Sequence, residues 1–215
     1  MRMRKKPNLV PRMAACEDLL IKNPEEFMGE WLDVYSDYDE LHLELGCGKG
    51  RFTAEMCDMN RNIFFVAVEK VPDAMVVAME RVKAKGLTNV RFLDFDAANC
   101  LSIFEPGEVD RIYINFPDPW KKNKQSKRRL TAKSFLEIYE TILKPEGEIW
   151  FKTDNRPLFD WSVEQFQECG WELFEVTNDL HADGVQGVMT DYEKKFYEQG
   201  VPINRLVARK TGVEE

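Results

Sequence analysis

The chain has 215 residues, enough for one sizeable domain, and its 32% charged and 44% hydrophobic residues are typical of a soluble globular protein. No apolar run approaches the length of a membrane span, and no apolar stretch follows the basic N-terminus, so we expect neither a transmembrane helix nor a secretory signal. The five cysteines are scattered, without CxxC spacing or histidine partners, which predicts no disulfide framework and no metal site. Together these properties predict a reduced, cytoplasmic protein.

The distribution of charge is more informative than its sum. The net charge of −8 argues against a nucleic-acid partner, but the basic residues are segregated. Five of them precede the first acid, Glu17, and six more lie between Lys121 and Arg129. Basic segments on an acidic body are either contacts for a polyanion or merely solvated surface, and charge alone does not decide between these alternatives.

The N-terminal part of the chain shows little periodicity. We expect residues 1–22 to form a basic, flexible arm and residues 23–215 to form a single domain. Asn23, Pro24 and Glu26 are typical of a helix start, and aromatic residues follow at helical spacing. A helix from residue 23 that packs on the domain is therefore predicted.

From residue 41 onward, apolar runs of strand length alternate with helical segments. Strands are expected at 41–45, 63–68, 90–95, 109–114, 149–152, 171–176 and 203–208, and helices at 51–59, 73–84, 130–143, 159–168 and 190–198. This alternation predicts an α/β fold, a doubly wound, mostly parallel sheet of seven strands with helices on both faces. Ligands of such folds bind beyond the carboxyl ends of the strands, where Glu44, Glu69, Asp96, Asp118 and Asp154 fall.

The first of these strands leads into a glycine turn, Gly46-Cys47-Gly48-Lys49-Gly50. A strand, a glycine turn, a helix and an acid about 20 residues further on are typical of nucleotide binding. However, Arg51 occupies the place where the dinucleotide motif needs its third glycine. The carboxylate of Glu44 would repel a pyrophosphate and would suit an ammonium group instead.

The motif from Glu44 to Gly50 resembles the first motif of class I S-adenosylmethionine-dependent methyltransferases. In this interpretation, Glu69 accepts hydrogen bonds from the ribose hydroxyls, and Asp96, or its neighbour Asp94, accepts one from the adenine amino group.

The fourth predicted strand ends in Asn115-Phe116-Pro117-Asp118-Pro119-Trp120, which is similar to the Asn/Asp-Pro-Pro-aromatic motif of enzymes that methylate exocyclic amines. Here an acid separates the two prolines. A carboxylate only accepts hydrogen bonds, which suits the N–H donors of guanine, and guanine N7 has a free lone pair that needs no base. Asp118 could act by recognising the base or by stabilising the cationic product, and the sequence leaves both open. Trp120 either stacks on a base or faces the core.

Four motifs closely resemble the bacterial tRNA (guanine-N7-)-methyltransferases, over about residues 23 to 208. They are Glu44–Gly50, Asn115–Trp120, Phe151–Asn155, and Thr190–Glu193 followed by Lys195 and Phe196. The resemblance implies a class I methyltransferase fold with an antiparallel last strand. It also implies S-adenosylmethionine as the methyl donor and N7 of a guanine at position 46, in the variable loop of tRNA, as the acceptor.

The resemblance also implies roles for individual residues. Asp118 is the expected catalytic residue, and the cofactor site comprises Glu44, Gly46, Gly48, Glu69, Asp96 and Asp118. Substrate contacts are expected from Lys122, Asp154, Thr190, Asp191, Tyr192 and Glu193, and RNA contacts from Lys124, Gln125, Ser126, Lys127, Arg128 and Arg129, with no metal.

Some of these motifs have local explanations as well. Thr190 and Glu193 have the spacing of a helix capping box, and Asp154-Asn155 also fits a simple turn. Asp191 stands where the family has Glu as often as Asp, and its shorter side chain has less reach.

Other functions stay open on the sequence alone. One is methylation of a different nucleic-acid base, including an exocyclic amine or a base of ribosomal RNA. Another is RNA binding by a protein with a vestigial cofactor fold, and a more distant one is a nicotinamide-dependent oxidoreductase. The sequence allows either a monomer or a homodimer and does not indicate which tRNAs are preferred.

Overall fold

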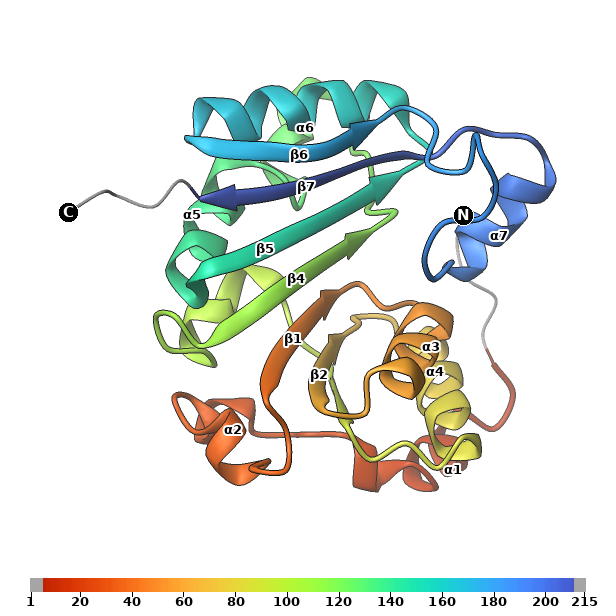
Figure 1. Ribbon diagram of the computed structural model, residues 1–215. Helices are drawn as coiled ribbons and strands as arrows, with labels where there is room; N and C mark the ends of the chain where they lie inside the picture. The colour runs from red at the N-terminus through yellow and green to blue at the C-terminus, as the bar shows by residue number, and fades with distance from the viewer. Residues whose placement is uncertain (1–5, 211–215) are drawn as a thin grey trace.

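Seven strands form one sheet in the order β3-β2-β1-β4-β5-β7-β6, as the computed structural model shows for residues 6–210 (Figure 1). The strands are β1 (Glu40–Leu45), β2 (Ile63–Val68), β3 (Val90–Leu93), β4 (Val109–Asn115), β5 (Leu143–Thr153), β6 (Trp171–Thr177) and β7 (Asn204–Lys210). β7 alone runs antiparallel to the other six strands, because it pairs antiparallel with both β5 and β6. The predicted fold, a mostly parallel seven-stranded sheet with an antiparallel last strand, is confirmed.

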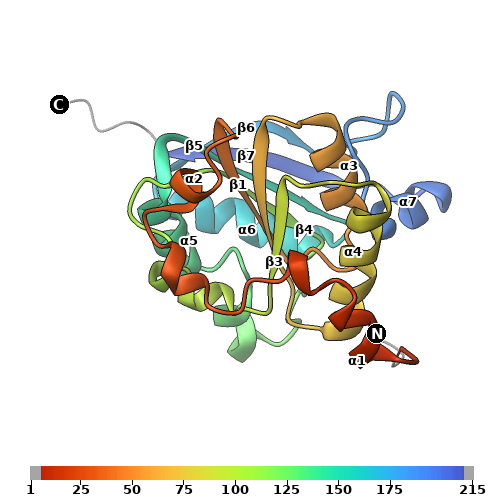
Figure 2. The ribbon, with the colours of Figure 1, turned by 90° about the horizontal axis from the view of Figure 1, so that it is seen from below.

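Helices cover the sheet on both faces. The described helices are α1 (Leu9–Ala14), α2 (Trp31–Val34), α3 (Arg51–Met59), α4 (Pro72–Ala84), α5 (Lys133–Ile142), α6 (Arg156–Glu168) and α7 (Asp191–Glu198). Figures 1 and 2 show α3 and α4 over β1 and β2 on one face and α5 and α6 on the other, while α7 lies beyond the carboxyl ends of β4 and β5. Within residues 6–210, no helix has the length and apolar character needed to cross a membrane.

Each face of the sheet has its own hydrophobic core, built from alternate residues of the same strands. In β2, Phe64 and Val66 pack into the core under α5 and α6, whereas Phe65 and Ala67 pack under α3 and α4. Successive side chains of a strand point to opposite faces, so a strand buried on both sides must be apolar throughout. This explains why β2 reads as a continuous apolar run.

The segment after residue 23 differs from its prediction. One continuous helix was expected, but the structure has a single 3-10 turn at Pro24–Phe27 and then the short helix α2. Gly29 separates them with φ = +78°, a left-handed conformation that interrupts a helix. The segment nevertheless packs on the domain, because Trp31 is fully buried and its indole N–H donates to the carbonyl oxygen of Ile103 at 2.7 Å.

Residues 6–22, which belong to the predicted N-terminal arm, lie along α4 and β3. Arg12 and Glu80 form an ion pair of 2.6 Å, and Lys83 Nζ donates to the carbonyl oxygen of Ala15 at 2.6 Å. Further along, the amide of Ile21 donates to the carbonyl oxygen of Phe92 in β3 at 3.1 Å. Residues 1–5 of the predicted arm, with three of its basic side chains, lie outside the described residues.

β5 begins at Leu143 rather than at Ile149, and α5 therefore ends earlier than predicted. The sequence Lys144-Pro145-Glu146-Gly147 reads as a helix stop followed by a loop, but here it belongs to a strand. The pairing of β5 with β4 is irregular at this point, since the register shifts between Val109 and Arg111. Such a bulge accommodates a proline that central strands usually exclude.

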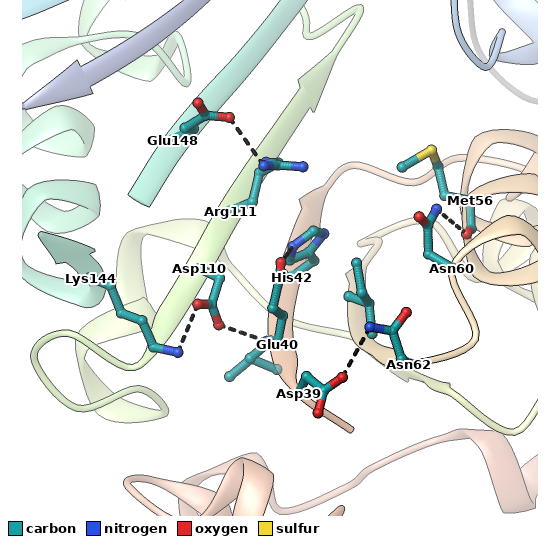
Figure 3. A network of polar contacts seen from close by, with 12 residues as sticks. Asp39, Glu40, His42, Met56, Asn60, Asn62, Asp110, Arg111, Lys144 and Glu148 are labelled. Atoms are coloured by element: carbon teal, nitrogen blue, oxygen red, sulfur yellow. Dashed lines mark hydrogen bonds and ion pairs between the residues drawn. The ribbon is translucent and has the colours of Figure 1, made fainter. Parts of the chain in front are cut away.

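The amino edge of the sheet carries a polar network whose side chains contact one another (Figure 3). Arg111 pairs with Glu148 at 3.2 Å, although the Arg111 Nε has no hydrogen-bond partner within the described residues. Asp110 accepts from Lys144 Nζ at 2.7 Å and from the amide of Leu41 at 2.8 Å, which ties β4 to β5 and β1. His42 is buried between Glu40 and Tyr113, and this burial lowers its pKa to about 4. These titratable residues hold strands together at the edge opposite to the carboxyl ends.

Two glycines of the turn after β1 offer a matched test of packing. A Cβ at Gly50 would lie 2.7 Å from Cα of Ala78 in α4, whereas a Cβ at Gly48 would have nothing within 4 Å. Both residues have positive φ, so both carry a strain of about 1–2 kcal/mol when replaced by alanine. Only Gly50→Ala adds overpacking, of about 1–3 kcal/mol.

We therefore expect Gly50→Ala to lower the free energy of unfolding by about 2–5 kcal/mol in urea denaturation, and Gly48→Ala by no more than about 2 kcal/mol. Equal losses in the two variants would show that the approach of the turn to α4 does not constrain the fold.

Candidate active site

The residues that follow the parallel strands meet at one edge of the sheet. The register pairs Leu45 with Val68 and Ile114, Val68 with Leu93, and Asn115 with Lys152. The predicted site residues after β1, β2, β3, β4 and β5 are therefore aligned along the carboxyl edge. In Figure 1 this is the edge beside which α7 lies.

The glycine turn presents bare backbone at this edge. Gly46 and Gly48 have φ of +81° and +59°, and no atom lies within 4 Å of the position of a Cβ on either residue. The turn is fixed from behind, because the amides of Gly46 and Cys47 donate to the carbonyl oxygen of Val68 at 2.9 and 3.0 Å. A rigid turn that borders open space fits the close approach of a cofactor.

Glu44 lies at the end of β1 with only 2% of its surface exposed. Thr53 Oγ1 in α3 donates to Glu44 Oε2 at 2.6 Å, and Asn115 Nδ2 at the end of β4 donates to Glu44 Oε1 at 3.3 Å. Burial disfavours the charged form and raises the pKa of Glu44 to about 7. Because the Glu44 carboxyl favours its neutral form below pH 7, a nearby cation, such as the ammonium group of a ligand, would stabilise its ionised form.

Glu69 and Asp96 provide two more carboxylates along the edge. The amides of Gly48 and Val71 donate to the two oxygens of Glu69 at 2.8 and 2.9 Å, which fixes this side chain beside the glycine turn. Asp96 pairs with Lys70 at 2.6 Å, which lowers the pKa of Asp96, and also accepts from the amide of Ala98 at 3.1 Å. Each carboxylate oxygen keeps a further lone pair, so both side chains fit the binding of hydroxyl or amino groups.

The turn after β4, Asn115–Trp120, is strained on both sides of Asp118. Phe116 has φ = +52° and Trp120 has φ = +40°, a left-handed conformation that bulky residues seldom adopt. The amide of Phe116 donates to the carbonyl oxygen of Lys152 at 2.8 Å, which anchors the start of the turn to β5. Asp118 is exposed, and within residues 6–210 its carboxylate has no ion-pair partner. Strain that presents a free carboxylate at the carboxyl edge is typical of a functional site.

Arg129 supports this turn from the inside. Its Nε donates to the carbonyl oxygen of Pro119 at 3.0 Å, and its guanidinium lies 4.3 Å from the ring centroid of Trp161. Arg128 instead lies over the ring of Trp120 at 5.1 Å. Arg129, a predicted RNA contact, therefore points toward the backbone of the turn. Trp120 has Arg128 as a cation–π partner.

The basic segment after the turn includes a 3-10 turn at Asn123–Arg128. Its exposed side chains include Lys122, Lys124, Lys127 and Arg128, while Gln125 and Ser126 are half-buried. A hollow of about 420 Å³ opens beside the segment, between α5 and α6, and Ser126, Lys127, Lys133, Ser134 and Trp161 contribute to its lining.

The predicted capping box at the start of α7 is present. The amide of Glu193 donates to Thr190 Oγ1 at 2.9 Å, and the amide of Thr190 donates to Glu193 Oε2 at 3.1 Å. Glu193 is fully buried, and its carboxylate also contacts Lys152 and His181. The structure therefore places Glu193 inside the domain, beneath the surface that Thr190 and its neighbours present.

The other predicted substrate contacts are more accessible. Asp191 forms two hydrogen bonds with Arg81 of α4, at 2.7 and 3.2 Å. Tyr192 is 58% exposed, and its ring stacks on Phe196. Phe196 in turn stacks on Phe116 of the turn Asn115–Trp120, which we call the acceptor turn. Asp154 is half-buried directly after β5.

Four polar residues at this edge were not among the predicted site residues: Thr53, Asn115, Lys152 and His181. Asn115 and Lys152 each lie inside one of the four family motifs, and this was the only indication in the sequence that they belong to the site. Thr53 and His181 carry no such signal, because their partners are 9 and 12 residues away on other elements. Within residues 6–210, no group of three or more acidic, His or Cys residues has the arrangement of a metal site.

Comparison with known proteins places the chain in a family. A family model described as "Putative methyltransferase" matches residues 39–206. The chain is 44% identical over 206 residues to a tRNA (guanine-N(7)-)-methyltransferase of Bacillus velezensis, covering 95% of each chain. It is 42% identical over 206 residues to the Bacillus subtilis protein of the same name, covering 95% of this chain and 97% of the relative.

The chain belongs to the tRNA (guanine-N7-)-methyltransferase family. The predicted family membership is therefore confirmed, and it extends over nearly the full length of both chains.

Solved structures support the fold at much lower sequence identity. The 16S rRNA methyltransferase KamB superimposes with a TM-score of 0.64 at 17% identity, over 86% of this chain and 94% of that chain. An antibiotic-related methyltransferase gives a TM-score of 0.62 at 17% identity, over 84% of this chain and 91% of that chain. Both share the class I methyltransferase architecture with this protein.

The raised pKa of Glu44 makes stability depend on pH in a defined direction. The pKa is about 7 in the folded protein and near 4.5 in the unfolded chain, so between these values the folded state binds more protons. The free energy of unfolding of the wild type should therefore fall as pH rises from 4.5 to 7, relative to that of Glu44→Gln, with a limiting slope of about 1.4 kcal/mol per pH unit.

Urea denaturation of the two proteins from pH 5 to pH 8 measures this difference. Parallel stability profiles would show that Glu44 is ionised in the folded state throughout this range.

Proposed function

We propose that this protein transfers a methyl group from S-adenosylmethionine to N7 of a guanine at position 46 of tRNA, in the variable loop, and that it does so in the cytoplasm. The relatives of similar length carry the name tRNA (guanine-N(7)-)-methyltransferase. The observation that carries the proposal is the hydrogen bond from Asn115 to Glu44. It joins the turn that presents Asp118 directly to the carboxylate beneath the glycine turn.

The residues along the edge fit the parts of the methyl donor. The buried carboxylate of Glu44 would be ionised by a nearby cation and would pair with the ammonium of the amino-acid moiety. The open backbone at Gly46 and Gly48 would border that moiety. Glu69 would hold the ribose hydroxyls, and Asp96 the adenine amino group. When bound, S-adenosylmethionine supplies an activated methyl group on a sulfonium.

Asp118 would act at the acceptor base. Its carboxylate is exposed at the end of β4 and accepts hydrogen bonds only, so it suits the N–H donors of guanine. Its negative charge would also stabilise the positive charge that develops on the purine as N7 is methylated. The strained turn fixes the backbone that carries this carboxylate before the substrate arrives, which would limit the reorganisation that methyl transfer requires.

The target nucleotide would be framed by residues of three elements. Lys122 follows the acceptor turn, Asp154 follows β5, and Thr190, Asp191 and Tyr192 begin α7. The exposed ring of Tyr192 offers an aromatic surface next to the turn. Glu193 would contribute to this set from beneath, by holding the start of α7.

The basic segment would hold the RNA backbone. Lys124, Lys127 and Arg128 are exposed, and Gln125 and Ser126 lie beside them. Lys127 and Ser126 also line the hollow between α5 and α6, together with Lys133, which pairs with Glu137 at 4.0 Å. Contacts of this type position a nucleic acid without reading its sequence, while the rest of the acidic body repels it.

Product mapping tests the proposed reaction. Unmodified tRNA incubated with the protein and S-adenosylmethionine should yield 7-methylguanosine in the variable-loop fragment, detected by nuclease digestion and mass spectrometry. Asp118→Asn should lower kcat about 100-fold or more, because the charge that stabilises the product is lost, while tRNA affinity stays within about threefold. Glu164→Gln, an exposed acid on α6, is the matched control and should leave kcat unchanged.

Methyladenosine, or methylation outside the variable loop, would contradict the proposed function and favour another nucleic-acid methyltransferase. Turnover of Asp118→Asn close to that of the wild type would leave the reaction in place and refute the role of Asp118.

The salt dependence of tRNA binding tests the basic segment. Replacing Lys124, Lys127 and Arg128 by Gln should weaken binding and reduce the slope of log Kd against log salt by about 2, since each phosphate contact contributes about 0.7–0.9. Replacing Lys22, Arg61 and Lys85, which are exposed elsewhere, removes the same charge and should leave the slope unchanged. Equal effects of the two triple variants would mean that net charge, and not this segment, governs RNA binding.

A further inference from the structure

A buried ion pair joins β5 to the start of α7. Lys152 Nζ donates to Glu193 Oε2 at 2.7 Å and to the carbonyl oxygen of Val188 at 3.0 Å. The side chains of Lys152 and Glu193 are 9% and 0% exposed. Burial disfavours the ammonium and lowers the pKa of Lys152, but the Glu193 carboxylate opposes that shift. The pair therefore lies inside the domain, although both neighbouring segments carry predicted substrate contacts.

His181 completes this network from the segment before α7. Its Nδ1 accepts from the amide of Gln186 at 3.1 Å, so in the neutral ring the proton lies on Nε2. Nε2 contacts Glu193 Oε1 at 3.0 Å, and the histidine side chain is 3% exposed. Both oxygens of one carboxylate thus hold together β5, the 181–188 segment and α7.

Lys152 also holds the acceptor turn, through its backbone. Its carbonyl oxygen accepts from the amide of Phe116 at 2.8 Å, and Asn115 is its register partner in β4. The ring of Phe116 stacks on Phe196 of α7 with centroids 6.2 Å apart. One residue therefore fixes the turn that presents Asp118 on one side and the helix that presents Tyr192 on the other.

Stability alone does not account for a buried charged pair at this place. Apolar residues of similar volume often stabilise a fold as well as a buried ion pair does, because the pair must first be desolvated. What an ion pair with further hydrogen bonds adds is a unique arrangement of the elements that it joins. Here those elements are the two walls between which the target nucleotide would lie.

We propose that Lys152 is a positioning residue for the methyl-transfer reaction, which acts through Glu193 and His181 to hold the start of α7 in register with the acceptor turn. This inference rests on the proposed function. It assigns Glu193 an indirect role, through the placement of Thr190, Asp191 and Tyr192. Neither Lys152 nor His181 touches the reacting atoms in this arrangement.

β5 itself supplies a matched control. Lys144, near its other end, forms an ion pair of 2.7 Å with Asp110 at the amino edge of the sheet (Figure 3). Lys144→Met removes the same charge from the same strand, but far from α7.

The test compares Lys152→Met, the double variant Lys152→Met/Glu193→Gln, and Lys144→Met. The single variant leaves the buried Glu193 carboxylate without its main partner, and a loss of its activity could reflect poor folding. The double variant removes both charges, so its thermal midpoint should recover relative to the single variant. Its kcat/KM for tRNA should nonetheless stay at least 30-fold below that of the wild type, with a raised KM for tRNA and an affinity for S-adenosylmethionine within twofold. Lys144→Met should retain kcat/KM within threefold.

Hydrogen exchange provides a readout that does not depend on activity. Amides of residues 181–198 should exchange at least tenfold faster in the double variant than in the wild type, and at the wild-type rate in Lys144→Met. Unchanged exchange in this segment, or wild-type kcat/KM in the double variant, would overturn the positioning role. Failure of the wild type to methylate tRNA would instead refute the proposed function, while the exchange rates would still decide whether Lys152 positions α7.

Discussion

The burial of the Glu44 carboxylate is the constraint on which the geometry of the site depends. It lies where β1, the helix after the glycine turn and the end of β4 converge, and it accepts from Thr53 on one side and Asn115 on the other. Desolvation, only partly offset by the hydrogen bonds from Thr53 and Asn115, raises the pKa of Glu44 to about 7 and so favours the neutral carboxyl below that pH. A cation that approached across the glycine turn would reverse this preference, so binding of the proposed cofactor would be linked to the charge on Glu44. Because the same carboxylate bonds to Asn115, such a change in charge would occur in direct contact with the turn that carries Asp118.

Negative and positive side chains occupy different regions around Glu44. Carboxylates lie along the carboxyl edge at Glu69, Asp96 and Asp118, where a nucleoside with hydroxyl and amino donors would bind. The cations of the basic segment lie just beyond the acceptor turn, and Arg129 links the two by donating to the carbonyl oxygens of Pro119 and Trp120. The segment that would hold the RNA backbone is thus tied to the turn that would hold the base. A phosphate contact there would be transmitted to the position of Asp118 over a short, bonded path.

Much of this was predictable from the sequence, for identifiable reasons. The mostly parallel, doubly wound sheet and the positions of the edge acids follow from the alternation of apolar strands and helices, together with the rule that ligands bind at the carboxyl ends. The helix expected from residue 23 was wrong, because Gly29 adopts a left-handed conformation that propensity does not reveal. β5 was predicted too short, because Pro145 and Gly147 read as a loop when the pairing of β4 is unknown. Roles such as that of Arg129 escaped prediction because a side chain in a basic run gives no indication of which carbonyl it faces.

The contacts of Lys152 are the clearest example of structure that the sequence does not predict. Within the motif Phe151–Asn155 the sequence draws attention to Asp154, the residue beyond the strand, and the lysine reads as an ordinary strand position. Its importance depends on two non-local facts: β5 pairs with β4 at Asn115, and the chain returns 41 residues later to place Glu193 beside Lys152. A capping box explains the pairing of Thr190 with Glu193 locally, but it accounts for only one hydrogen bond to the Glu193 carboxylate, that from the Thr190 amide. The remaining acceptor capacity is used by Lys152 and His181, and it converts a local helix cap into a contact between distant elements.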